Sequence, residues 1–182
     1  MADIPGIGDV LDFWREAGHE RWYRRDDSFD VIVRARFLPL WEDAVAGRLS
    51  PWETSDEGTL ALVIVLDQFP RNMFRGLAKA FGSDALARKV ASRALVRGVD
   101  TRIGPPLLQF LYLPFMHSED LADQIRCVGL FRNRGDDENL RYAEEHADII
   151  RRFGCFPHRN RALGRTTTPE EQAFLNAGGF SG

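Results

Sequence analysis

A carboxylate, an amide and a guanidinium lie close together where an apolar stretch of the sequence ends. Asp67 and Gln68 directly follow an apolar run, and Arg71 comes four residues after Asp67. A buried carboxylate without a partner is costly, so Asp67 needs a cation or several donors, and Arg71 is the nearest cation. Two interpretations stay open: a structural ion pair that fixes the turn, or a polar group of Asp67, Gln68 and Arg71 at the rim of a pocket.

A second candidate group is the run His117-Ser118-Glu119-Asp120. A serine cap and acidic residues in the first turn are typical of a helix start and need no functional explanation. His117 is different, because it directly follows the apolar run YLPFM. An imidazole beside a carboxylate can act as a general base or bind a metal. The alternative is a histidine with only a structural hydrogen bond.

The third candidate group is the segment Phe156-Pro157-His158-Arg159-Asn160, which joins two predicted helices. Aromatic, imidazole, guanidinium and amide groups together can hold an anionic or planar polar group. Binding residues are concentrated in loops on a rigid scaffold. A packed loop, with Phe156 as its anchor and Arg159 capping helix carbonyls, explains the same residues equally well.

Established catalytic and metal motifs are absent from the sequence. There is no G-x-S-x-G, Walker loop, Rossmann fingerprint or H-E-x-x-H. Cys127 and Cys155 lack the spacing of metal ligands. Arg152 and His158 each lie three residues from Cys155 and would lower its pKa, although a free cysteine is usually a small buried hydrophobe. We therefore expect no metal and no cofactor.

Length and composition predict one domain over residues 1–182. The chain is 44% hydrophobic and has a net charge of −3, which supplies material for one core and does not suggest binding to nucleic acid. Its longest apolar run, Leu60 to Leu66, is far shorter than the roughly 20 residues of a membrane span. The first residues, MADIPGIGDV, lack the positive charge and apolar segment of a signal peptide. We expect a protein of the cytoplasm.

Basic residues are nearly all arginine, since Lys79 and Lys89 are the only lysines. Arginine makes bidentate contacts with carboxylate or phosphate that lysine cannot make, and a genomic composition bias is the alternative explanation. Lys89, Arg93 and Arg97 recur at four-residue steps and predict a basic stripe on one helix.

The elements that must position these side chains are helices. Apolar residues recur at helical spacing, and no stretch alternates polar and apolar residues as strands do. Pro39 is expected to kink or split the first long helix. The run Val63 to Val65 can also be read as a strand, but its length and the preceding cap favour a helix. Helices are expected over about 28–47, 55–69, 83–98, 107–114, 118–135, 137–154 and from 168, with Ser28, Ser55, Ser83, Ser118 and Thr168 as the N-caps.

Four long stretches carry a resemblance to a known family. They are LDQFPRNMFRG at 66–76, KAFGSDALA at 79–87, YLPFMHSEDLADQ at 112–124 and FGCFPHRNRALGRTTTPEEQAFL at 153–175. With the opening VLDFWRE and the closing GGFSG, the chain resembles the bacterial family of unknown function DUF924. The resemblance implies an all-α fold of antiparallel helical hairpins stacked as a tetratricopeptide-repeat-like α/α superhelix. It implies no activity.

A binding module is the function that these features favour. A helical groove lined by arginine and aromatic side chains would take a small anionic molecule or a peptide. This hypothesis requires the polar residues at the helix ends to meet in a common cavity, among them Asp67, Arg71, His117 and His158. The expected ligand-binding residues are Asp67, Gln68, Arg71, Arg159 and Asn160.

Two other functions stay open. One is an enzyme, perhaps a hydrolase, in which His117 and His158 exchange protons, Glu119 or Asp120 orients an imidazole, and arginines hold an anion. The other is a structural or self-associating protein, which would need an exposed patch of tryptophans. Its candidate residues are Trp14, Trp22, Trp41 and Trp52.

Overall fold

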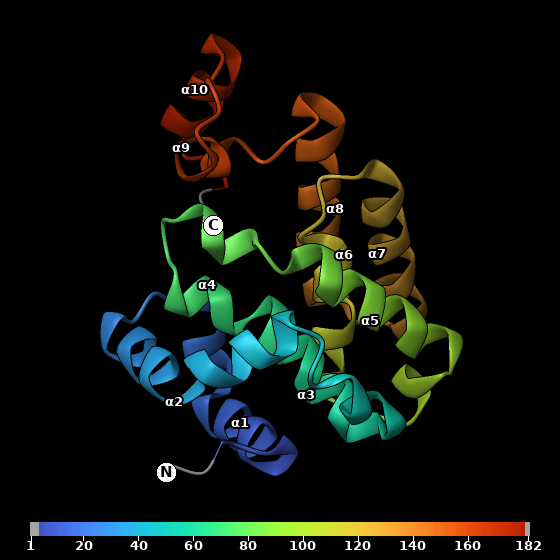
Figure 1. The fold of residues 1–182 in the computed structure, drawn as a ribbon. Coiled ribbons are helices and arrows are strands. Elements are labelled where there is room, and N and C mark those ends of the chain that lie inside the picture. Colours follow the sequence, from blue (N-terminus) through green and yellow to red (C-terminus); the bar gives the residue numbers. More distant parts are fainter. Residues whose placement is uncertain (1–3, 181–182) are drawn as a thin grey trace. The chain divides into compact units, whose positions relative to one another are not determined.

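The computed structural model describes residues 4–180, and this part of the chain holds helices and no strand (Figure 1). The all-α prediction is confirmed. No helix among the described residues has the length and apolar character to cross a membrane. The α-helices are α1 (Ile7–Tyr23), α2 (Asp27–Val45), α3 (Asp56–Asp67), α4 (Phe69–Met73), α5 (Asp84–Val96), α6 (Leu113–Met116), α7 (Leu121–Arg134), α8 (Asp137–Phe153), α9 (Asn160–Leu163) and α10 (Pro169–Asn176). The 3-10 helices are η1 (Ser50–Thr54), η2 (Ala78–Phe81), η3 (Val99–Thr101), η4 (Leu107–Leu111) and η5 (Pro157–Arg159).

Residue contacts divide the chain into two compact units. Unit 1 comprises Met1–Arg75 and Lys79–Pro114, and unit 2 comprises Gly76–Ala78 and Phe115–Gly182. Each unit is described by itself. The single domain over residues 1–182 stays a prediction.

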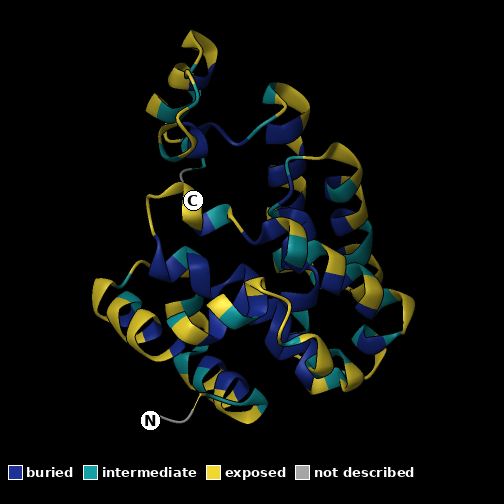
Figure 2. Ribbon diagram, in the orientation of Figure 1, coloured by how far each residue is buried: buried dark blue, intermediate teal, exposed yellow. Residues whose placement is uncertain are grey.

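Helix α3 is the centre of unit 1. Every residue from Gly58 to Asp67 is buried, and α1, α2, α4, α5, η1 and η4 all pack against it. Figure 2 shows this helix almost wholly in the colour of buried residues. Ser55 accepts a hydrogen bond from the backbone N–H of Gly58, so the predicted N-cap is confirmed. A run that is apolar on all sides therefore forms a central helix and not a strand.

An aromatic cluster packs beside α3 and depends on a break in α1. Gly18 has a φ of 69°, which L-residues rarely adopt, and it divides α1 into two segments. The break lets Trp22 return towards Trp14, so that its indole N–H donates to the Trp14 carbonyl at 2.7 Å. Rings of the cluster contact each other at centroid distances of 4.5–6.3 Å; they are Phe13, Trp14, Trp22, Phe29, Phe37, Phe69 and Phe110.

The cluster removes the expected tryptophan patch. Trp14 and Trp41 are buried, and Trp22 and Trp52 are half-buried, so none of the four is exposed. Aromatic side chains of this size contribute most when they are enclosed by other rings. The four tryptophans therefore do not supply the expected patch, and self-association itself stays a prediction.

Three of the predicted N-cap residues are wrong, although the helices that follow them exist. Helix α2 is capped by Asp26, which accepts from the N–H groups of Ser28 and Phe29, and it runs unsplit past Pro39. Ser83 precedes α5 but its hydroxyl donates to the Leu66 carbonyl, so it joins α5 to α3 instead of capping. A serine hydroxyl that donates to a buried carbonyl of another helix does not cap the helix that follows it.

The third correction concerns the approach to α7. Asp120, and not Ser118, caps α7 by accepting from the Ala122 N–H at 2.8 Å. The predicted helix over 107–114 is also wrong, since this stretch forms η4 and the start of the short α6. Proline at both ends of the apolar run leaves too few residues for a regular α-helix.

Unit 2 is built on the hairpin of α7 and α8. The two helices pack together and are joined by the turn at Gly135, which adopts the left-handed conformation predicted for a helix end. Buried residues of α8 recur at Ala143, His146, Ala147 and Ile150, one face of a helix. Thr168, the predicted N-cap of α10, forms a capping box with Glu171, and Pro169 is the first residue of the helix.

Candidate functional site

The Asp67 group lies in unit 1 where α3 ends. Asp67 is fully buried, and Gln68 donates to its Oδ2 at 2.6 Å. The Arg71 guanidinium lies 3.3 Å from Oδ1 of Asp67 and also donates to the Asp67 backbone carbonyl. The predicted partnership of Asp67 with Arg71 is confirmed.

Arg71 has a second and closer carboxylate partner that the sequence did not predict. Its two terminal nitrogens donate to the two oxygens of Asp84, at 2.9 and 3.0 Å. Burial opposes the charge of Arg71, but the two carboxylates outweigh it and raise the pKa of the guanidinium. The group joins α3, α4 and the first turn of α5, which gives Asp67, Gln68 and Arg71 a structural role.

The segment at 156–160 forms the centre of a second group, in unit 2. Phe156 is fully buried and packs with Ile149 and Ile150, as the packed-loop interpretation required of its anchor. The Arg159 guanidinium lies over the Phe156 ring, 4.5 Å from its centroid, and only 6% of this residue is exposed. Asn160 donates to Glu171 at 3.1 Å and to Thr167 at 3.4 Å. Phe156 thus positions a buried cation.

Glu119 is held by arginine and backbone, not by an imidazole. Both of its oxygens accept from the Arg165 guanidinium, at 2.8 and 2.9 Å, and one also accepts from the Phe156 N–H. Desolvation would raise the pKa of Glu119, but these hydrogen bonds, first that of Arg165, lower it. Asp120 caps α7. Both carboxylates proposed to orient a histidine therefore have structural partners.

His146 is the residue of this group that sequence analysis missed. It is 5% exposed, and its Nδ1 lies 2.7 Å from the Tyr142 carbonyl. A carbonyl only accepts, so Nδ1 carries the proton. Burial first, together with the charges of His117 and Arg159, lowers the pKa of His146 to about 4, although the hydrogen bond to the Tyr142 carbonyl raises it. His146 is therefore neutral at pH 7.

Two imidazoles of unit 2 pack against the Phe156 ring. The His146 ring lies 5.5 Å from the Phe156 centroid and the His158 ring 5.7 Å from it. His117, half-buried after α6, lies within electrostatic range of His146. The structure thus brings together His117, His158 and Arg159. Asp67, Gln68 and Arg71 belong to unit 1, so a common cavity for both groups stays a prediction.

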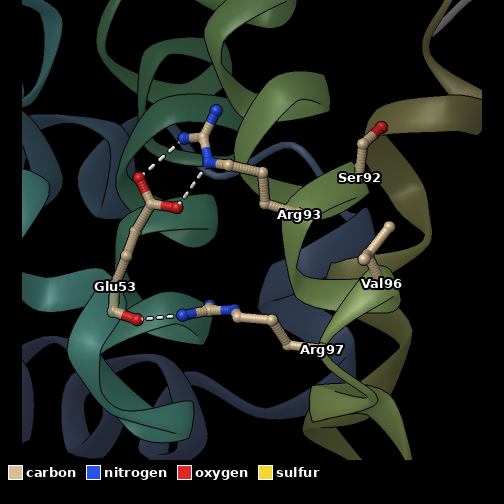
Figure 3. A pocket seen from close by; sticks show the side chains of 5 residues that line it. All are labelled: Glu53, Ser92, Arg93, Val96 and Arg97. Atoms are coloured by element: carbon tan, nitrogen blue, oxygen red, sulfur yellow. Dashed lines mark hydrogen bonds and ion pairs between the residues drawn. The ribbon is translucent and has the colours of Figure 1, made fainter.

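The basic stripe on α5 serves a different purpose. Arg93 makes a bidentate pair with Glu53 of η1, at 2.8 and 2.6 Å, and Arg97 donates to the Glu53 carbonyl (Figure 3). Arg97 also donates to the Thr59 hydroxyl. Val96 and Ser92 complete the lining of a hollow of about 360 Å³ there. An anion would have to displace Glu53, so this hollow is a weaker candidate than the group in unit 2.

The comparison with family models covers nearly all of the described chain. Residues 10–179 match the family described as "Bacterial protein of unknown function (DUF924)". This chain belongs to the DUF924 family. The resemblance carried by the four sequence stretches is thereby confirmed.

This DUF924 protein is also similar to a solved structure, the protein of unknown function ATU0120 from Agrobacterium tumefaciens. The two are 44% identical, with a TM-score of 0.90, and the match covers 94% of this chain and 97% of that chain. A comparison with curated proteins found no match. The fold is therefore shared with this relative, and the site must be interpreted from its own chemistry.

The expectation for Cys155 is wrong in this DUF924 protein. Burial first, and then its hydrogen bond to Glu171 at 3.2 Å, raise the pKa of the thiol to about 11. Burial and the Glu171 carboxylate disfavour the thiolate more strongly than the charge of Arg165 favours it. Across residues 4–180, no three His, Cys, Asp or Glu side chains are placed to hold a metal ion together.

A signal for His146 was present in the sequence. It stands at the buried position of α8, between Ala143 and Ile150 in the helical repeat. A histidine on the apolar stripe of an amphipathic helix lies near the core, and sequence analysis had weighed only the histidines beside prolines and carboxylates. Arg165 gave no comparable signal, because only the tertiary fold places it beside Glu119.

Proposed function

We propose that this protein is a binding module that holds a small anionic molecule at the 156–160 segment of unit 2. One observation carries the proposal: a buried guanidinium, Arg159, and two imidazoles, those of His146 and His158, pack on one aromatic anchor, Phe156. A guanidinium and ring N–H groups are the donors that suit carboxylate and phosphate oxygens.

Charge in this part of unit 2 favours an anion. Arg159 carries a full positive charge, whereas His146 stays neutral at pH 7. Glu119 lies within electrostatic range of Arg159. Its two oxygens are, however, occupied by Arg165, which balances its charge. The Arg159 guanidinium and the nearby ring N–H groups would donate to an anion in a region of low dielectric, where each hydrogen bond is stronger.

The setting of the site is part of the same proposal. The α7–α8 hairpin supports the idea of stacked helical hairpins similar to tetratricopeptide repeats. Two free cysteines, Cys127 and Cys155, support a reducing compartment, the cytoplasm. The hydrolytic alternative with His117 and His158 as acid–base groups stays a prediction.

Isothermal titration calorimetry with inorganic phosphate, acetate and succinate at constant ionic strength tests the proposal. We expect the wild type to bind at least one of these anions. We expect Arg159→Lys and Arg159→Gln to weaken binding by about tenfold or more, equivalent to about 1.4 kcal/mol, because neither keeps the planar fork of donors.

Arg161→Gln is the matched control, because Arg161 lies two residues further along the chain, on α9, but is exposed. We expect this variant to bind like the wild type. Equal losses in the Arg159 and Arg161 variants would show a diffuse charge effect and contradict the proposed site. Failure of the wild type to bind any of the three anions would contradict the function itself.

A further inference from the structure

The segment Gly178–Phe180 passes back over unit 2 after α10. Gly178 adopts a φ of 78°, and its N–H donates to the Leu175 carbonyl. A Cβ on Gly179 would lie 2.5 Å from the ring of Phe174, so the backbone lies flat on that ring. Two glycines are therefore needed for the chain to turn and approach Phe174 this closely.

This turn places the ring of Phe180 against the rings of His146 and His158. The Phe180 centroid lies 4.4 Å from the His146 ring and 5.2 Å from the His158 ring. Phe180 also packs against the cluster of Ile149, Ile150 and Phe156, yet it is only half-buried. A single aromatic ring thus covers two of the three imidazoles of unit 2.

We propose that Gly178–Phe180 is a displaceable strap, in which the Phe180 ring shields His146 and His158 and controls entry to the imidazole group. That the entering molecule is an anion rests on the proposed function. The shielding itself rests on the ring contacts alone.

Opening of the strap needs little of the fold to change. It follows α10, a helix of eight residues, and is joined to it through the Gly178–Gly179 pair. Releasing Phe180 exposes one half-buried ring, whereas the anchor Phe156 and the α7–α8 hairpin keep their own contacts. Local openings of this kind cost much less than global unfolding.

The test compares the histidines of the full-length wild type and Phe180→Ala. The chain has four histidines, and diethyl pyrocarbonate modifies the unprotonated imidazole. We expect Phe180→Ala to accelerate modification of His146 and His158 about fivefold or more, as sites held closed by a local equilibrium do when the closed form is lost. Exposed His19 of unit 1 is the internal reference and should react at an unchanged rate.

Ile125→Ala is the matched control, since it truncates an exposed apolar side chain of α7 in the same unit. It should leave all four rates unchanged. Unchanged rates at His146 and His158 in Phe180→Ala would overturn the strap. Loss of helical circular dichroism with faster reaction at His19 would also overturn it, because Phe180 would then be a core residue.

Phosphate titration of Phe180→Ala separates the strap from the proposed function. We expect tighter phosphate binding than in the wild type, because the ligand no longer pays to displace the ring. A wild type that binds none of the anions tested while Phe180→Ala reacts faster would contradict the anion site and leave the strap supported. Faster modification with unchanged phosphate affinity would overturn control of entry.

Discussion

At the scale of residues, arginine–carboxylate forks join segments that are far apart in the sequence. In each fork, two nitrogens of one guanidinium donate to the two oxygens of one carboxylate, a geometry that lysine cannot adopt. Arginines of this composition therefore link segments of the fold, whether or not a genomic composition bias also explains their number. The pairs are Arg71–Asp84, Arg75–Asp30, Arg93–Glu53, Arg102–Asp56 and Arg165–Glu119.

Among these pairs, that of Arg71 should matter most for stability. Arg71→Ala leaves the fully buried Asp67 and the nearly buried Asp84 without this guanidinium. We expect a loss of about 3–5 kcal/mol in the free energy of unfolding, measured with urea. Arg15→Ala removes an exposed pair with Asp12 and should cost less than about 1 kcal/mol. Similar losses in the two variants would contradict this ranking.

His146 predicts a pH dependence of stability. Its pKa of about 4 in the folded protein lies below the ordinary 6.5, so between these values the unfolded chain binds a proton that the folded chain does not. Stability from this group is therefore complete above pH 6.5, declines as the pH falls towards 4, and stays reduced below 4. The full effect is about 3 kcal/mol.

Urea midpoints of the wild type and His146→Phe across this pH range measure the effect. Phenylalanine suits the aromatic surroundings of His146 but does not titrate. The urea midpoint of His146→Phe should therefore fall less than that of the wild type as the pH is lowered through this range. Parallel curves for the two proteins would show that other groups cause the acid sensitivity.

At the scale of elements, helix positions follow from the apolar pattern, but their ends depend on close contacts. The N-cap at Ser55 formed as predicted, whereas Ser83 donates its hydroxyl to the Leu66 carbonyl. Both serines precede acidic residues and an apolar run, so the sequence pattern is the same. What differs is a buried carbonyl within reach of Ser83, which the local sequence does not reveal.

Gly58 of α3 is likewise explained by a close contact with another element. Alanine favours helices over glycine, yet a Cβ at position 58 would lie 2.2 Å from the Trp52 carbonyl oxygen of η1. We expect Gly58→Ala to lower the free energy of unfolding by about 1–3 kcal/mol, because η1 must move. Gly8→Ala in α1 has nothing within 4 Å of its Cβ and should change stability by less than about 0.5 kcal/mol. A stabilised Gly58→Ala variant would refute the close approach.

At the scale of the whole molecule, the net charge is negative, although the proposed site holds a cation. The chain carries −3 overall, while the proposed site holds the buried cation Arg159. An extended polyanion interacts with the charge of the whole surface, whereas a small anion interacts mainly with groups within a few ångströms of it. We expect no retention on heparin at about 0.15 M salt, where the Debye length is about 8 Å. Strong retention would indicate a polyanion surface instead of a compact site.

The sequence by itself determined the helical class, the helix of α3 with its N-cap at Ser55, and the pairing of Asp67 with Arg71. These follow from periodicity, from the cost of a buried charge and from neighbours within four residues. Only the tertiary structure decided that Glu119 pairs with Arg165, that Ser83 binds a carbonyl and that Phe180 reaches His146. Those contacts join residues 17 to 46 positions apart. Hydrogen bonds and ring contacts act over a few ångströms, so which distant residues meet is decided only when the helices pack.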